Sequence, residues 1–414
     1  METLKIALAS DWFYPKIGGI ETHIQELAYN LLRLGHEPHI ITHDYRKFGS
    51  TFNDDFPFPV HRLHGEIYNS SEHVSFGIRS IYQANKLYKQ ERFDITHVHS
   101  IYSPLGMIVA NVSKGLRDVP TVATNHSFFE WRFRKKLWLP LIRYALRRVD
   151  TIIAVSRAVA RDTQKIIKND KKPVFIIPNA IDVSFWRPPD HDERVKARKM
   201  IGAESFDFVV FAPGRFTERK RIHVVPRIIA KASRMLGTTK RRLYLVIIGD
   251  GPLADRVREE ARRYSDSVRV YLNGFVERKL LRHYYWAADL TIVPSRLEAF
   301  SITALESMAC GVPVIGYKGG GIEDLIVEAV TGFLVESDDD AAKRIASLAV
   351  NDELHAKMRE TAPLHVAKNF SWDKVIYWIL DTYKATMSSA RPGEKLFLLY
   401  RAWLGLTGLW RRRL

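Results

Sequence analysis

The sequence predicts an α/β protein with two doubly wound, Rossmann-like domains, each built on a parallel sheet with helices on both faces. Its 414 residues are too many for one compact domain and suit two. Short Val/Ile-rich segments alternate with helical periodicity in both halves, which is typical of parallel strands buried on both faces. A Pro-rich, charged stretch at 176–193 separates the halves. We therefore expect two domains that face each other across a cleft.

Six strands are expected in each half, bounded by helical segments. Helical periodicity fills most intervals, as in the first one, where Ile24, Leu27 and Leu31 recur at about 3.6 residues. The expected strands cover 4–10, 39–45, 95–100, 120–126, 151–156 and 174–179 in the first half, and 208–214, 244–251, 268–274, 290–295, 313–317 and 332–336 in the second.

The expected domain boundaries follow from these segments. The N-terminal, acceptor-binding domain covers 1–185 and the C-terminal, nucleotide-sugar-binding domain covers 186–370. A helix at 371–388, capped by Ser371, returns to the N-terminal domain, and a basic amphipathic tail covers 389–414.

Charge and cysteine content limit the class of protein. The 63 Lys and Arg outnumber the 46 Asp and Glu, and this excess implies an anionic partner: nucleic acid, an acidic membrane face or a phosphorylated substrate. The single Cys310 excludes a disulfide framework and a thiolate metal cluster within the chain. No secretory signal pattern and no spanning apolar run are visible, so we expect a cytoplasmic protein.

Two loops carry residues suited to phosphate. Gly18 and Gly19 join the first strand to the first helix, where missing Cβ atoms and free helix N–H groups admit an anion. In the second half, Gly214 and Arg215 end a strand and Lys220 follows, so that a guanidinium fork and a point charge lie near one another. The alternatives are a tight turn without ligand and a solvated basic loop.

An acidic pair follows the strand at 290–295. Glu298 lies in the loop and Glu306 lies eight positions later, on the helix that leads to Gly311. Carboxylates near the carboxyl end of a strand suit sugar hydroxyls, and a purely structural role is the alternative. His126 follows another strand, while His97 and His99 share a buried strand and are expected to be structural.

These motifs resemble the retaining glycosyltransferases of family 4, which have the GT-B fold. The segment 298–315 carries the E-x7-E pattern, and 18–23, 176–182 and 214–220 follow the family's order, so the resemblance covers about 4–388. Residues 10–24 and 41–45 further resemble transferases of N-acetylglucosamine to phosphatidylinositol, with phosphatidylinositol mannosyltransferases as the nearest alternative.

The resemblance implies a role for each candidate residue. Arg215 and Lys220 neutralise the leaving diphosphate, Glu298 contacts the transferred sugar and His126 lies over that sugar. Glu306 holds the donor ribose. The implied donor site further comprises Gly18, Gly19, Gly214, Gly274, Phe275, Gly319, Gly320, Gly321 and Ile322.

The implied reaction moves a hexose or N-acetylhexosamine from a nucleotide sugar to a lipid. UDP-N-acetylglucosamine is the first choice of donor, and GDP-mannose with a lipid or polysaccharide acceptor is the alternative. Retention follows from the resemblance, with the leaving phosphate taking the acceptor proton. No metal or other cofactor is expected, because cations oppose the diphosphate and 338–340 reads as a surface turn. One departure from the family is Arg221, where glycine is common.

Two basic, aromatic stretches predict a peripheral protein on the inner, anionic face of a membrane. They contain Trp131, Arg132, Arg134, Lys135 and Lys136, and in the tail Trp403, Trp410, Arg411, Arg412 and Arg413. The alternatives are a solvated helix face and a tail docked on the protein itself. A non-catalytic nucleic-acid-binding protein is the competing class, but no nucleic-acid motif is present and the acidic pair would repel a phosphate backbone.

Overall fold

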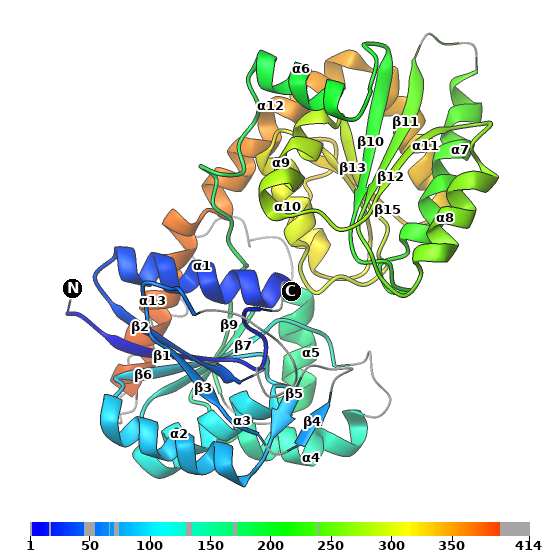
Figure 1. Cartoon of the computed structure of the whole chain (residues 1–414). Coiled ribbons are helices and arrows are strands. Elements are labelled where there is room, and N and C mark those ends of the chain that lie inside the picture. The colour runs from blue at the N-terminus through cyan, green and yellow to red at the C-terminus, as the bar shows by residue number, and fades with distance from the viewer. Residues whose placement is uncertain are drawn as a thin grey trace. The chain divides into compact units, whose positions relative to one another are not determined.

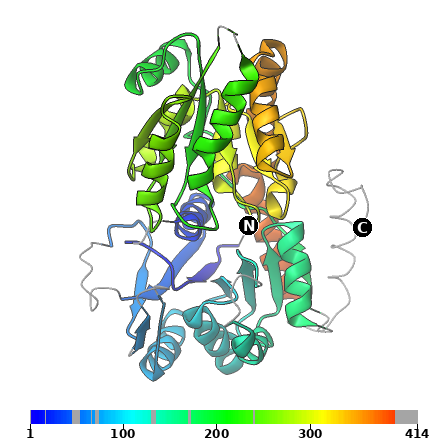
Figure 2. The same cartoon turned by 90° about the vertical axis from the view of Figure 1, so that its right-hand side faces the viewer.

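The computed structural model describes residues 2–15, 18–44, 54–65, 67–69, 74–129, 135–168, 172–237, 239 and 241–389. The chain forms two compact units (Figure 1). Among the described residues, the first contains those up to Val155, then Val159–Ile177, and those from Ile376 to Ser389. The second contains Ser156–Ala158 and Pro178–Val375. Figures 1 and 2 show helices on both sides of the sheet in each unit.

The first unit is built on a seven-stranded parallel sheet in the order β3-β2-β1-β6-β7-β8-β9. The chain moves outward from β1 on one side and restarts at β6 on the other, so a topological switch point lies between these two strands. The strands are β1 (Lys5–Ala9), β2 (Glu37–His43), β3 (Val60–Leu63), β6 (Ile95–His99), β7 (Thr121–Asn125), β8 (Thr151–Ala154) and β9 (Val174–Ile176). A separate antiparallel pair is formed by β4 (Ile67–Asn69) and β5 (Val74–Phe76).

Helices cover this sheet because each has an apolar face. In α1 the residues Ile24, Leu27 and Leu31 are fully buried, as their spacing predicts. The helices are α1 (Gly19–Arg33), α2 (Ile78–Glu91), α3 (Pro104–Ala110), continued by a π-helical turn (Asn111–Leu116), α4 (Lys135–Leu146), α5 (Arg157–Ile167) and α13 (Trp372–Ser389).

The end of α13 belongs to the core of the first unit. Tyr383 is fully buried and its hydroxyl lies 2.7 Å from His97 Nδ1 on β6. One turn later, Thr386 donates a hydrogen bond of 2.9 Å to Thr151 at the start of β8. These polar contacts connect α13 to the strands β6 and β8.

The second unit is built on a six-stranded parallel sheet in the order β12-β11-β10-β13-β14-β15. Its switch point lies between β10 and β13. The strands are β10 (Asp207–Pro213), β11 (Arg242–Ile248), β12 (Arg269–Asn273), β13 (Leu290–Val293), β14 (Val314–Tyr317) and β15 (Gly332–Val335). The helices are α6 (His191–Met200), α7 (Val225–Leu236), α8 (Ala254–Arg263), α9 (Arg278–Ala287), α10 (Ile302–Ala309), α11 (Asp338–Ala349) and α12 (Asp352–Asn369), with 3₁₀ turns at Ile222–Val224 and Gly321–Asp324.

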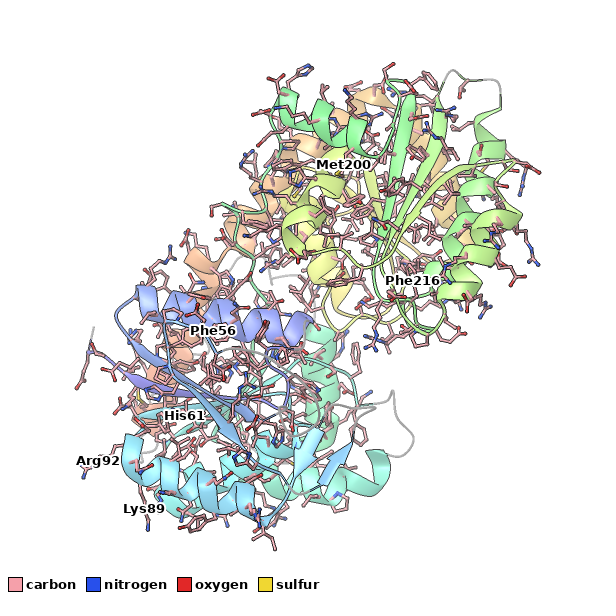
Figure 3. The ribbon with its side chains drawn as sticks, in the orientation of Figure 1. Phe56, His61, Lys89, Arg92, Met200 and Phe216 are labelled. Carbon is pink, nitrogen blue, oxygen red and sulfur yellow. The ribbon has the colours of Figure 1, made fainter. Side chains whose placement is uncertain are left out.

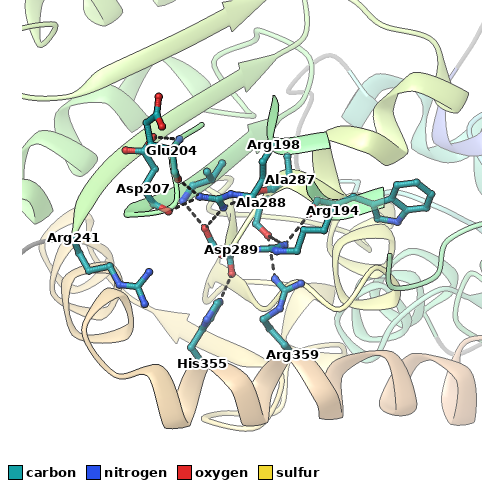
Figure 4. Close-up of polar contacts among 12 residues, drawn as sticks. Arg194, Arg198, Glu204, Asp207, Arg241, Ala287, Ala288, Asp289, His355 and Arg359 are labelled. Carbon is teal, nitrogen blue, oxygen red and sulfur yellow. Dashed lines mark hydrogen bonds and ion pairs between the residues drawn. The ribbon is translucent and has the colours of Figure 1, made fainter. Parts of the chain in front are cut away.

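The two ends of this sheet differ in chemistry. Phe216 follows β10 and Met200 precedes it, and Figure 3 shows them at opposite ends of the sheet. At the amino end, Asp289 accepts hydrogen bonds from Arg194 (2.6 Å), Arg198 (3.0 Å) and the amide of Val209 (2.8 Å; Figure 4). Burial alone raises the pKa of Asp289, but the two guanidinium groups hold it below its usual value. This charge cluster is saturated by protein contacts and is structural.

All six strands predicted in each half are present, and the two Rossmann-like sheets confirm the predicted fold class. The sequence analysis missed β3, an edge strand in which Leu63 is the one buried residue, so that no apolar run marks it. The unit boundary follows Ile177, before the Pro188–Pro189 pair. The reading of 338–340 as a surface turn is wrong, because these residues form the first turn of α11, capped by Ser337.

Candidate functional site

The loops after β10 and β13 flank the switch point of the second unit and join two predicted residues. Lys220 Nζ donates to Glu298 Oε1 over 2.6 Å, although 78 positions separate them in the chain. The Glu298 side chain is 3% exposed and that of Lys220 is 25% exposed. Burial alone raises the pKa of Glu298, but the charge and hydrogen bond of Lys220 hold it below its usual value. The pair is therefore ionised at neutral pH, at the edge where ligands of such sheets bind.

Arg215 lies in the loop after β10, and its side chain is exposed. Two glycines that the sequence analysis did not single out hold this loop. A Cβ on Gly249 would lie 2.0 Å from the carbonyl oxygen of Gly214, and a Cβ on Gly251 would lie 2.6 Å from that of Phe216. The amide of Phe216 also donates to Asp250 O over 2.8 Å. The glycines of the "GDG" sequence after β11 therefore let two loops pack closely and fix the backbone beside Arg215.

The glycines after β14 serve the same purpose for Glu298. Gly320 has φ +141°, and a Cβ there would lie 2.3 Å from the carbonyl oxygen of Glu298. A Cβ on Gly321 would lie 1.9 Å from that of Ala299, and the Gly321 amide donates to Glu298 O over 2.6 Å. The loop after β14 thus lies directly against the loop after β13 and fixes the Glu298 backbone.

The amides of this glycine loop already have acceptors within the protein. Glu323 Oε1 accepts from the amide of Gly319 over 2.8 Å and from that of Gly320 over 3.2 Å. A ligand anion at these two amides must therefore displace the Glu323 carboxylate. The predicted cradle at Gly319–Ile322 stays a prediction, with Glu323 as its internal competitor.

Glu306 lies on α10, whose first turn is capped by Ser301. The residue is 8% exposed, and its carboxylate accepts a hydrogen bond of 3.1 Å from the hydroxyl of Tyr285 on α9. One turn further on, burial and the neighbouring Glu306 charge raise the pKa of the Cys310 thiol well above its usual value. Tyr285 orients the carboxylate, and Cys310 stays a neutral thiol.

Phe275 follows β12, and its side chain is 64% exposed. A Cβ on the preceding Gly274 would meet nothing within 4 Å. Packing therefore does not explain the glycine, and the exposed ring next to it is available for stacking.

Arg221 adopts the left-handed conformation with φ +53°, which explains why glycine is suited to this position. Its guanidinium donates to Pro294 O over 2.8 Å and to Asp338 over 2.7 Å, and it lies 5.0 Å from the centre of the Tyr317 ring. These contacts anchor the end of the Lys220 loop.

In the first unit, the switch point is held by a buried polar cluster that the sequence analysis missed. Asp11, just after β1, lies 2.7 Å from His43 Nε2 and accepts from the amide of Leu105 over 3.1 Å. The hydroxyl of Ser103 also donates to it, and Asp11, His43 and Ser103 are completely buried. The cluster joins the loops after β1 and β6 to the end of β2.

The glycine pair begins α1. Gly18 is extended, with φ −172°, so its backbone does not require glycine. A Cβ there would lie 2.5 Å from the carboxylate of Glu21, a buried residue in the first turn of α1. An anion that approaches Gly18 and Gly19 would therefore share the helix end with the Glu21 carboxylate.

His126 follows β7, and its Nε2 lies 3.2 Å from Nδ1 of His99 at the end of β6. Burial lowers the pKa of His126 well below its usual value, so the ring is neutral at pH 7. His97 lies 2.6 Å from Thr124 and 2.7 Å from Tyr383, which agrees with the structural role expected for it.

Comparison with known proteins decides the family. The model of Glycosyltransferase Family 4 matches residues 17–185, and that of Glycosyl transferases group 1 matches residues 194–365. The chain belongs to glycosyltransferase family 4.

Named relatives of this family-4 glycosyltransferase differ in acceptor. The chain is 25% identical over 406 residues to the phosphatidylinositol N-acetylglucosaminyltransferase GPI3 subunit of Saccharomyces cerevisiae, covering 94% of this chain and 85% of that one. It is 26% identical over 397 residues to N-acetyl-alpha-D-glucosaminyl L-malate synthase of Bacillus anthracis, covering 92% and 97%. The solved structure of Anabaena Alr3699/HepE in complex with UDP matches with a TM-score of 0.75 at 18% identity, covering 92% and 100%. This last match bears on the fold alone.

The predicted membrane residues fall largely outside the described part of this glycosyltransferase. Trp131, Arg132 and Arg134 lie outside it, and so do the side chains of Lys135 and Lys136, whose backbone begins α4. The tail residues Trp403, Trp410, Arg411, Arg412 and Arg413 lie outside it as well. Among the helices that are described, none is both long and apolar enough to cross a bilayer.

Proposed function

We propose that this glycosyltransferase transfers N-acetylglucosamine, with retention, from UDP-N-acetylglucosamine to a lipid of the phosphatidylinositol type. The observation that carries the proposal is the Lys220–Glu298 ion pair at the β10/β13 switch point, with the exposed Arg215 in the same loop as Lys220. Both curated relatives described above are named for N-acetylglucosamine, which supports the choice of sugar. The name of the first supports a phosphatidylinositol acceptor.

The donor site follows from the chemistry of these groups. A lysine ammonium has three donors, so Lys220 can keep its bond to Glu298 and still donate to a phosphate. Arg215 adds a fork that suits two phosphate oxygens. Glu298 and Glu306 then accept hydrogen bonds from the sugar and ribose hydroxyls, and Phe275 borders the base. His126 contacts the transferred sugar.

The proposed reaction breaks the bond between the anomeric carbon and the diphosphate oxygen. Negative charge grows on the leaving diphosphate, and we propose that the cationic side chains of Arg215 and Lys220 stabilise it. One such preorganised donor is worth about 3–4 kcal/mol in comparable sites. These cations take the part that a divalent metal plays in other transferases, so we propose a reaction without metal. The leaving phosphate takes the proton of the acceptor hydroxyl.

The lipid acceptor agrees with the basic, aromatic stretches of the sequence. Cations near an anionic surface contribute about 1 kcal/mol each, and interleaved tryptophans enter the interface. We propose that 131–136 and the tail bind the inner membrane face, which would bring the lipid headgroup to the enzyme.

The test uses the full chain with phosphatidylinositol-containing vesicles and UDP-N-acetylglucosamine. Glu306→Ala should reduce transfer more than about 100-fold, because the ribose loses a buried charged acceptor. Glu353→Ala, an exposed glutamate on α12, is the matched control and should keep wild-type activity.

Undiminished transfer by Glu306→Ala, at wild-type folding by circular dichroism, would overturn the assignment of Glu306. Transfer from GDP-mannose but not from UDP-N-acetylglucosamine would overturn the proposed donor. Transfer to a soluble acceptor, with none to the lipid, would overturn the proposed lipid acceptor.

A further inference from the structure

Three histidines from neighbouring elements of the first unit meet in one cluster. His23 lies on α1, His99 ends β6 and His126 follows β7. One ring nitrogen of each lies within 4.8 Å of the corresponding nitrogens of the other two. His23 is 5% exposed and His99 is completely buried. The three residues lie at the carboxyl side of adjacent strands and arise from three separate motifs.

The distances suit a shared cation. His99 Nδ1 and His126 Nε2 are 3.2 Å apart. With zinc–nitrogen bonds of about 2.0–2.1 Å, two ligands of a tetrahedral zinc ion lie about 3.3 Å apart. The His23 ring stands edge-on to both others, with centres 5.1 Å from His126 and 5.6 Å from His99. The His23 nitrogen lies within 4.8 Å of the other two, so the His23 ring would have to move closer to complete a set of three ligands.

Burial disfavours the protonated form of all three rings. Burial lowers the pKa of His23 to about 4 and that of the other two well below the usual value. The remaining effects on these rings come from one another and from His97. The rings are therefore neutral at pH 7, which is the form that binds metal.

A second cluster, His39, His61 and Glu91, provides a contrast. His39 Nδ1 lies 2.9 Å from His61 Nε2 and 3.9 Å from Glu91. However, Lys5 Nζ lies 2.7 Å from the same Glu91 carboxylate and already supplies its positive charge. The Lys5 ammonium already pairs with the carboxylate of this second cluster, so we expect no metal to bind there. A variant of this cluster is therefore a control for the metal-binding experiment.

We propose that His23, His99 and His126 form a binding site for a divalent transition ion of the zinc class. Three imidazoles leave a fourth position open for water or an anion. Because the proposed function assigns His126 to the sugar, the ion would inhibit transfer. The binding itself does not depend on that function.

The experiment titrates metal-stripped full-length protein with Zn²⁺ by calorimetry and with Co²⁺ by visible absorption, without nucleotide sugar. Wild type should bind one equivalent and show the intense absorption of four-coordinate Co²⁺. His23→Ala should weaken binding more than about 100-fold, since even residues behind the ligands cost 10–100-fold. His23→Cys, which keeps a ligand, should restore binding, and His61→Gln should bind like wild type.

Three results would overturn the site: no saturable equivalent in wild type, equal affinity in folded His23→Ala, or loss of binding in His61→Gln. Inhibition of transfer by Zn²⁺ in wild type, relieved in His23→Ala, would support the link to His126. If no transfer is found with any donor, the proposed function fails while the metal titration still decides the site.

Discussion

Arg221 is a non-glycine residue at a position whose backbone conformation suits glycine. Its left-handed conformation is one that glycine adopts without strain, and a non-glycine residue there costs about 1–2 kcal/mol. The contacts with Pro294, Asp338 and Tyr317 offset that cost. Arg221 therefore keeps a backbone conformation that favours glycine, and its side-chain contacts stabilise it there.

Arg221→Ala and Arg221→Gly lose the same contacts and differ in the backbone alone. Glycine relieves the strain but gains entropy in the unfolded chain, an opposing effect of about 0.4–1 kcal/mol. We expect Arg221→Ala to be less stable than Arg221→Gly by about 0.5–1 kcal/mol, measured by urea denaturation. An alanine variant that is the more stable of the two would show that this conformation is not strained.

At the scale of elements, the loops after the strands hold each other in place. The loop after β14 packs on the loop after β13 through Gly320 and Gly321, and the loop after β11 packs on the loop after β10 through Gly249. Glu298 and Arg215 therefore lie on loops that have little room to move. Close backbone packing therefore fixes the main chain that carries these two charged side chains.

Gly320→Ala should disturb this packing. A Cβ would lie 2.3 Å from a backbone oxygen that cannot rotate away, in a conformation that side chains rarely adopt. We expect a loss of about 3 kcal/mol or more in the free energy of unfolding, from denaturant titration. Gly274→Ala has open space around its Cβ and should stay within about 0.5 kcal/mol of wild type. Equal stability of the two variants would contradict this account of the loops.

At the scale of the whole molecule, acid stability depends on neutral histidines buried in the fold. His39 Nδ1 on β2 lies 2.9 Å from Nε2 of His61 on β3, the residue labelled in Figure 3, and burial lowers the pKa of His39 to about 4. Between pH 6.5 and 4 the unfolded chain binds a proton that the folded chain does not. Stability therefore falls as pH falls through this window.

His39→Gln should flatten this part of the pH profile. Lowering the pKa of His39 from 6.5 to about 4 makes the free energy of unfolding fall by about 3 kcal/mol at most between pH 7 and pH 4. The variant lacks this residue, so its free energy of unfolding should fall by that much less over the same range. Denaturation at several pH values measures it. Near pH 8 the ring is neutral in both the folded and the unfolded chain. The difference in unfolding free energy between wild type and variant should therefore not change with pH there. An unchanged slope below pH 6.5 would refute the assignment.

Much of the candidate site was visible in local sequence patterns. Strands, glycine turns and the acidic pair are encoded by neighbouring residues, because alternation, helical spacing and the absence of a Cβ act over a few positions. The partners of these residues were not visible. The Tyr285 hydroxyl holds Glu306, and Asp11 contacts the end of β2 and the start of α3, so these contacts link positions far apart in the chain. The pattern of residues within one segment cannot predict a contact with a distant segment.

Local patterns thus identified two α/β halves, the six expected strands of each half and the family to which the chain belongs, but not β3, β4 and β5. The order of strands in each sheet, the Lys220–Glu298 pair and the histidine cluster were decided by tertiary structure. The reason is physical: strand formation reflects the burial of nearby side chains, whereas a hydrogen bond or ion pair between loops exists only after β10 lies beside β13 and β6 beside β7.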